Sequence, residues 1–164
     1  MLRPTHFIGL GCIFVALAAA PAAAQQRPLG VFGVWGAFAD GGRCYAIARP
    51  SEAGSRGTEP FASVGYWRPQ GPSGQVHFRL SAEKRGESAV LLRIEGRTFQ
   101  LFGRGWDAWA PDARADAELL TAMRTGMDMV VETRSTRGRL IRDRYRLRGA
   151  PSAIDAAALA CARS

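Results

Sequence analysis

The stretch QVHFRLS, residues 75–81, decides the fold class, because apolar and polar side chains alternate along it without a break. The apolar side chains share one face: Val76, Phe78 and Leu80. The polar side chains share the other face: His77, Arg79 and Ser81. A repeat of two is the pattern of a β-strand with one face in the core and one in solvent. We therefore predict a strand whose first set is buried and whose second set is exposed.

Similar short segments, separated by Gly, Pro and Asp turn signals, lie on both sides of this strand. We expect strands at residues 31–38, 43–48, 61–68, 89–94, 98–102, 127–133 and 139–147. Residues 25–29 are predicted to be a mobile lead-in, and residues 103–111 a Trp-containing loop.

Two helices are predicted late in the chain. Asp112 is expected to cap the first, which runs to about Thr125 with Gly126 after it. Its predicted buried stripe is Ala115, Leu119, Ala122 and Met123. Ser152 is expected to cap the second helix, whose apolar residues include Ile154, Leu159 and Cys161.

Seven or eight strands at hairpin spacing, without a strand–helix–strand rhythm, predict a mainly β (α+β) protein. The sheet is expected to be antiparallel and either sandwich-like or strongly curved, with the two late helices on one side or end. The residues after position 24 are enough for one domain with its own core.

The first 24 residues have the pattern of a secretory signal peptide. A basic start at Arg3 and His6 precedes an apolar run over 7–20, and Ala22 to Ala24 provide the small residues of a cleavage site. The run is shorter than the roughly 20 residues that span a bilayer as a helix. We therefore predict a signal peptide at 1–24, a single domain at 25–164, and no transmembrane segment after cleavage. The expected location is the periplasm, or the outer membrane or cell surface.

Cysteine use fits export. Cys12 lies in the signal, which leaves Cys44 and Cys161 as an even pair in an oxidising compartment. We predict a disulfide between them; two buried free thiols are the alternative.

The chain is basic, with a net charge of +8, and its positive charge is almost entirely arginine. A GC-rich genome is one explanation, and an anionic partner such as lipopolysaccharide phosphates or acidic glycans is the other. The sharpest local feature is the last predicted strand. There, arginines alternate with apolar or acidic residues, so four of them share one face: Arg142, Arg144, Arg146 and Arg148.

We interpret these four arginines, extended by Arg139 in the preceding turn, as a candidate anion-binding ridge. The alternative is a solvated sheet face whose charges prevent aggregation of an edge strand.

Other candidate sites are weaker. His77 is the one histidine after the signal, so we expect no metal site and no cofactor, and assign His77 an exposed structural role. Trp106 and Trp109 flank Asp107; this loop is either a carbohydrate platform or, more simply, a loop anchored in the core by a Trp. A catalytic acid pair would need a second carboxylate there. Asp112 and Asp116 are explained by the start of a helix.

An ordered set of features resembles the invasion-associated locus B (IalB) family of exported alphaproteobacterial proteins. These features are Phe32 to Trp35, Cys44 to Pro50, Ser63-Val64, Ala108 to Ala110, the acidic helix start Asp112 to Glu118, Met123 to Met127, Gly138 to Gly149, and Ser152 to Cys161. The chain departs from the family pattern at Val34, where Asp is frequent, and lacks a further Cys pair. The resemblance implies an exported envelope protein with no agreed catalytic residues and a role in envelope interaction or host-cell contact.

The sequence thus predicts a non-enzymatic exported envelope protein of the IalB type. Its expected partner is an anionic envelope or host polymer, or another protein; nucleic acid is not expected. Two alternatives remain open: an envelope enzyme acting on glycans, and a periplasmic chaperone or inhibitor that pairs its sheet edge with a partner strand.

Overall fold

The computed structural model describes residues 26–54, 58–67 and 73–163, so the predicted signal peptide lies outside the described residues. In chain order the elements are β1 (Arg27–Phe32), β2 (Trp35–Asp40), β3 (Arg43–Ala48), β4 (Phe61–Trp67), β5 (Ser73–Arg79), β6 (Val90–Ile94), β7 (Arg97–Arg104), β8 (Asp107–Trp109), α1 (Ala113–Thr125), β9 (Asp128–Arg134), β10 (Leu140–Arg146) and α2 (Ala150–Ala162).

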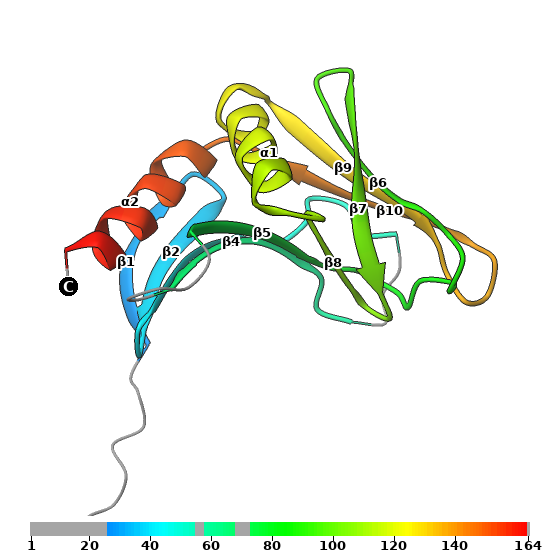
Figure 1. The fold of residues 1–164 in the computed structure, drawn as a ribbon, viewed down its shortest axis with the longest axis horizontal. Helices are drawn as coiled ribbons and strands as arrows, with labels where there is room; N and C mark the ends of the chain where they lie inside the picture. Colours follow the sequence, from blue (N-terminus) through cyan, green and yellow to red (C-terminus); the bar gives the residue numbers. More distant parts are fainter. Residues whose placement is uncertain (1–25, 55–57, 68–72, 164) are drawn as a thin grey trace, which may run out of the picture.

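The strands form one antiparallel sheet in the order β1-β2-β3-β4-β5-β8-β7-β6-β9-β10 (Figure 1). The sheet curves back on itself. This brings the rings of Phe78 on β5 and Tyr145 on β10 to 5.9 Å from each other across the core. Both helices lie on the same side of the arch made by β4 and β5 (Figure 1). The prediction of a mainly β, α+β fold with a strongly curved antiparallel sheet and two late helices is confirmed.

The free edge of β10 is covered by other parts of the chain. The Arg144 N–H donates to the Glu52 carbonyl at 2.8 Å, and the Ser51 N–H donates back to the Arg144 carbonyl at 2.8 Å. Farther along the strand, the Trp35 indole donates to the Arg146 carbonyl at 2.9 Å. The opposite edge, β1, carries Pro28 and a register shift beside it, and both features hinder addition of another strand.

The alternation of 75–81 is confirmed at Val76, Phe78 and Leu80, which are fully buried. Ser81, predicted to be exposed, is also fully buried. The reason is that β5 ends at Arg79, so the chain leaves the period of two before it reaches Ser81.

The first helix matches its prediction closely. Asp112 caps α1 by accepting a hydrogen bond from the Ala115 N–H at 2.8 Å. Leu119, Ala122 and Met123 are buried, while Ala115 is only half-buried.

The predicted start of the second helix is wrong. α2 begins at Ala150 with Gly149 as its N-cap and Pro151 in its first turn, so Ser152 is not the cap. Gly149 has φ 92°, and a Cβ there would lie 1.8 Å from the Phe32 carbonyl oxygen. This close approach requires glycine and fixes where the helix can begin. Leu159, expected on the apolar side, is half exposed.

Two predicted loops and one predicted strand are also corrected. The strand at 31–38 is two strands, because the chain turns at Gly33 and Val34 between β1 and β2. Gly33 has φ 60°, and its position against the Arg148 carbonyl leaves no room for a Cβ. The lead-in at 25–29 contains the start of β1, and the loop at 103–111 contains the end of β7 and all of β8.

The predicted disulfide between Cys44 and Cys161 is present. Their Cα atoms are 5.7 Å apart, and the bond joins β3 to the last turn of α2 across 117 residues. Among the described residues, neither helix is long and apolar enough to cross a membrane.

Candidate functional site

The arginine-rich strand β10 has the two faces that its sequence predicts. Its inward residues are buried: Ile141, Asp143, Tyr145 and Leu147. On the other face, Arg142, Arg146 and Arg148 are exposed and Arg144 is half-buried. The structure therefore places Arg142, Arg144 and Arg146 on the outer face of β10 as predicted, whereas β10 ends at Arg146 and Arg148 lies in the turn after it.

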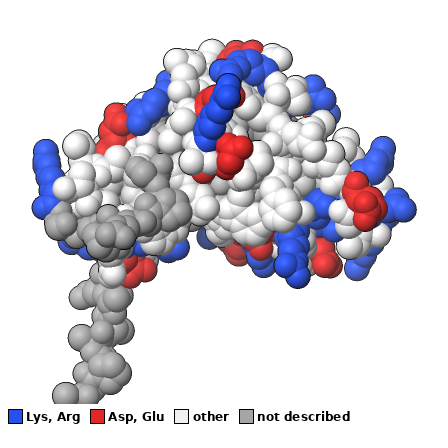
Figure 2. Space-filling model, in the orientation of Figure 1, with Lys and Arg blue, Asp and Glu red and all other residues white. Residues whose placement is uncertain are grey.

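The upstream half of this face is neutralised by acidic side chains. Arg142 Nη2 lies 2.6 Å from Glu132 Oε1, and Arg93 Nε lies 2.9 Å from Glu132 Oε2. Partial burial alone would raise the pKa of Glu132, but hydrogen bonds from these two arginines outweigh it and lower the pKa. Arg144 Nε lies 3.7 Å from Glu52 Oε2. Basic and acidic side chains are likewise interspersed on the face shown in Figure 2.

The downstream half differs, because Arg146 and Arg148 have no carboxylate within ion-pair distance in the described part of the chain. Asp128 lies opposite Arg146 in the strand register without forming an ion pair with it. Arg146 borders two hollows, one of about 450 Å³ beside the β1–β2 turn and one of about 630 Å³ shared with Arg148. We call the surface made by Arg146 and Arg148 the β10-end surface.

Arg139 does not belong to this surface. It precedes β10 and borders a different hollow of about 230 Å³, with Arg137 and Trp106. Arg146 is seven residue steps farther along an extended chain, a distance of roughly 20 Å or more. The proposed five-residue ridge is therefore divided into a remote Arg139, two paired arginines and two unpaired ones.

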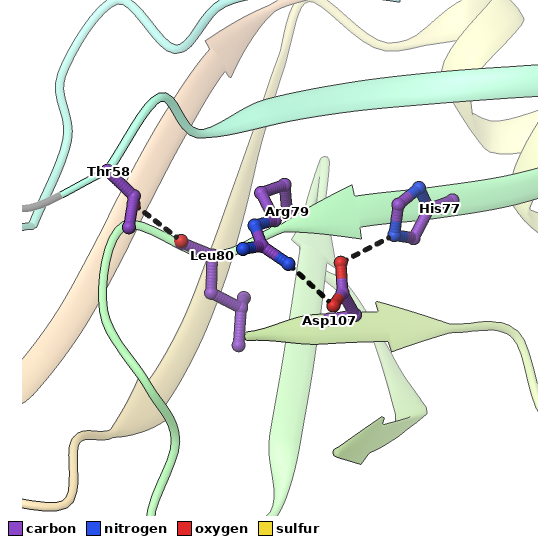
Figure 3. Close-up of polar contacts among 5 residues, drawn as sticks. All are labelled: Thr58, His77, Arg79, Leu80 and Asp107. Atoms are coloured by element: carbon purple, nitrogen blue, oxygen red, sulfur yellow. Dashed lines mark hydrogen bonds and ion pairs between the residues drawn. The ribbon is translucent and has the colours of Figure 1, made fainter. Parts of the chain in front are cut away.

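A second polar cluster lies on the outer face of β5 and β8 (Figure 3). His77 Nε2 is 3.0 Å from Asp107 Oδ1, and Arg79 Nη1 donates to Asp107 Oδ2 at 2.8 Å. Burial lowers the pKa of His77 more than the neighbouring carboxylate raises it. Because a carboxylate oxygen can only accept, His77 Nε2–H is the donor to Asp107. His77 is half-buried, so the exposed position expected for it is wrong. In the same view, the Thr58 hydroxyl donates to the Leu80 carbonyl at 3.0 Å and fixes the end of the strand.

Aromatic rings surround this cluster and pack against one another. His77 stacks on Trp109 with 5.3 Å between ring centroids, and Trp109 stacks on Phe102 at 6.2 Å. Phe61 meets the His77 ring edge-on at 5.4 Å. These contacts hold the rings against one another on the outer face of β5 and β8.

The two Trp residues near Asp107 are half-buried, so the expectation that one of them anchors the core is wrong. The fully buried Trp is Trp35. The Arg79 guanidinium carbon instead lies over the Trp106 ring, 5.8 Å from the ring centroid.

Each carboxylate considered for acid–base chemistry has its own structural role. Asp112 caps α1, and Asp116 accepts a hydrogen bond from the Val76 N–H at 2.7 Å. Burial raises the pKa of Asp116. Asp107 hydrogen-bonds to His77 and Arg79, and no second carboxylate pairs with it among the described residues. Within those same residues, no group of three His, Cys, Asp or Glu could hold a metal ion.

Two features of this region were not predicted from the sequence. Glu132 lies directly opposite Arg142 in the β9–β10 hairpin, so the register around the turn at 134–138 could have revealed that ion pair. Asp143 is fully buried and accepts hydrogen bonds from the N–H groups of Gly54 at 2.7 Å and Ser81 at 2.9 Å. Nothing in the local pattern identifies those two partners.

Comparisons with family models, curated proteins and solved structures find no match to this chain. The resemblance to the IalB family remains a prediction that rests on the residues quoted above.

Proposed function

We propose that this chain is a non-enzymatic exported envelope protein that binds an anionic partner through the β10-end surface. The observation that carries the proposal is the contrast between the arginines within β10 and those at its end. Arg142 and Arg144 have carboxylate partners, whereas Arg146 and Arg148 are exposed without one. An exposed guanidinium with no internal partner is available for bidentate hydrogen bonds to phosphate or carboxylate.

The proposal includes an exported location, in the periplasm or at the cell surface. The disulfide between Cys44 and Cys161 supports it, because such bonds persist in oxidising compartments. The IalB resemblance adds a role in envelope interaction or host-cell contact. The partner would be an anionic envelope component, and lipopolysaccharide phosphates fit a pair of free arginines.

The two alternatives have less support from the described residues. A chaperone that adds a partner strand would need an open edge. β10 is covered by residues 51–52, and β1 carries Pro28 and a register shift. A glycan enzyme would need an acid pair beside Asp107, whose two oxygens instead bind His77 and Arg79.

The test compares two variants with equal loss of charge, one within β10 and one at its end. Binding of purified lipopolysaccharide and of an unrelated polyanion is measured at low and moderate salt. Arg146→Ser/Arg148→Ser removes the unpaired arginines, and Arg142→Ser/Arg144→Ser, the matched control, removes the paired ones. We expect salt-sensitive binding that falls at least about tenfold in the first variant and changes little in the second. Equal loss in both variants would show that only net charge matters, which would contradict the proposal.

A further inference from the structure

Exposed apolar side chains gather at the β10-end surface. The described residues include six exposed large hydrophobic side chains, and three of them border this surface: Val31 at 79 % exposure, Val34 at 42 % and Met127 at 77 %. Val31 and Val34 border the hollow of about 450 Å³, and Met127 borders that of about 630 Å³; Arg146 borders both. Exposed apolar groups that gather in one place mark an interaction surface, whereas scattered ones need no explanation.

The fold holds these side chains on the two sides of β10. On one side, the β1–β2 turn contacts the strand end, where the Val34 N–H donates to the Arg148 carbonyl at 3.3 Å. On the other side, the Leu147 N–H donates to the Met127 carbonyl at 2.8 Å. Arg146 and Arg148 therefore stand between two exposed apolar groups that belong to different parts of the chain.

This combination separates two kinds of anionic ligand. A water-soluble polyanion would use the arginines but would leave Val31 and Met127 in water. An anionic lipid offers phosphate to the arginines and acyl chains to the apolar side chains, so both parts of the surface gain from contact. Arginine can also extend its guanidinium to the headgroup level while its stem lies along apolar atoms.

We propose that the β10-end surface and its apolar neighbours dock on the anionic lipid surface of the envelope. Arg146 and Arg148 bind lipid phosphates, and the side chains of Val31, Val34 and Met127 insert among the upper acyl chains. Asp128 is the acidic side chain that borders the same surface, and it would face the headgroup region. The inference rests on the proposed function, because it names the class of anionic partner.

The experiment uses co-sedimentation with vesicles of phosphatidylcholine, with and without phosphatidylglycerol, and a parallel binding assay with inorganic tripolyphosphate. Val31→Ser/Met127→Ser removes apolar contact and keeps every charge. The matched control, Phe102→Ser/Leu140→Ser, removes two other exposed apolar side chains, at 59 % and 52 % exposure, which border neither hollow.

We expect the wild-type protein to bind the phosphatidylglycerol vesicles and not the neutral ones. Val31→Ser/Met127→Ser should weaken vesicle binding about tenfold or more while leaving tripolyphosphate binding unchanged. The control should bind vesicles like the wild type. Arg146→Ser/Arg148→Ser should lose both ligands.

Three results would overturn the inference: vesicle binding by Val31→Ser/Met127→Ser equal to the wild type, equal binding to neutral vesicles, or tripolyphosphate binding without vesicle binding. The last result would leave the proposed function intact and identify a soluble polyanion or acidic protein as the partner. Absence of binding to both ligands would overturn the inference and the proposed function together.

Discussion

Asp143 is the residue whose removal should damage the fold most clearly for its size. Its carboxylate is fully buried and accepts hydrogen bonds from the backbone N–H groups of Gly54 and Ser81. These two contacts fasten the segment after β3 and the end of β5 to β10. Substitution by alanine would leave both N–H groups without that acceptor. The Ser81 N–H is buried, whereas the Gly54 N–H is only partly buried and borders the hollow of about 230 Å³.

The magnitude follows from the two contacts. A buried donor without a partner costs about 1–3 kcal/mol, which applies to the Ser81 N–H, and the partly buried Gly54 N–H adds less. Removal of a buried charge returns part of this cost, because the native fold no longer desolvates a carboxylate. We therefore expect Asp143→Ala to lower the free energy of unfolding by about 2 kcal/mol. Asp143→Asn should lose less, since its carbonyl oxygen can still accept one of the two bonds.

The assay is equilibrium unfolding in urea, with the slope checked for two-state behaviour. Asp155→Ala is the control. Asp155 also pairs with a distant residue, Arg124 at 2.7 Å, but both side chains are partly exposed, so this loss should stay at or below about 1 kcal/mol. If Asp143→Ala cost no more than Asp155→Ala, the structural role assigned to Asp143 would be wrong.

Three further predictions concern residues away from the binding surface. Cys44→Ser/Cys161→Ser should lower the free energy of unfolding by up to about 5 kcal/mol, because the disulfide joins residues 117 positions apart. Thermal unfolding of the variant measures this loss. An unchanged melting temperature would contradict the prediction. Tyr145→Phe should be at least as stable as the wild type, because the buried hydroxyl has no partner among the described residues; a clear loss in urea unfolding would reveal a missing partner. The lowered pKa of His77 means that the unfolded chain binds its proton more readily, so stability should fall as pH drops below about 6.5. His77→Gln, which can still donate to Asp107, should lose less stability between pH 7 and pH 5; identical pH profiles would refute this assignment.

Most of the fold prediction rests on strand alternation, because burial of one strand face produces alternating apolar and polar residues in the sequence. The alternation is clear in residues 75–81 and 139–147, and the side chains predicted to point inward there are buried. Ser81, predicted to point outward, is the exception. The missed features depend on contacts between distant segments. The turn at Gly33 lies inside an apolar, glycine-rich run, and its reason is the approach of the Arg148 backbone.

In the candidate site too, features set by local spacing could be predicted, and features set by contacts between distant segments could not. The shared face of the arginines on β10 follows from their spacing, and the Glu132 partner follows from hairpin register. Which arginines stay unpaired does not follow from local sequence. Glu52 reaches Arg144 only because the chain after β3 covers the edge of β10. The apolar neighbours Val34 and Met127 likewise meet the strand end only in the folded chain.

The most direct test of the central claim is a map of backbone amide shifts by NMR as tripolyphosphate is added to the disulfide-bonded domain. Binding at the β10-end surface predicts shifts confined to Arg146, Arg148 and the adjoining residues of the β1–β2 turn and the start of β9. Shifts centred on His77 and Trp109, on the outer face of β5 and β8, would contradict the account and move the functional site to that face.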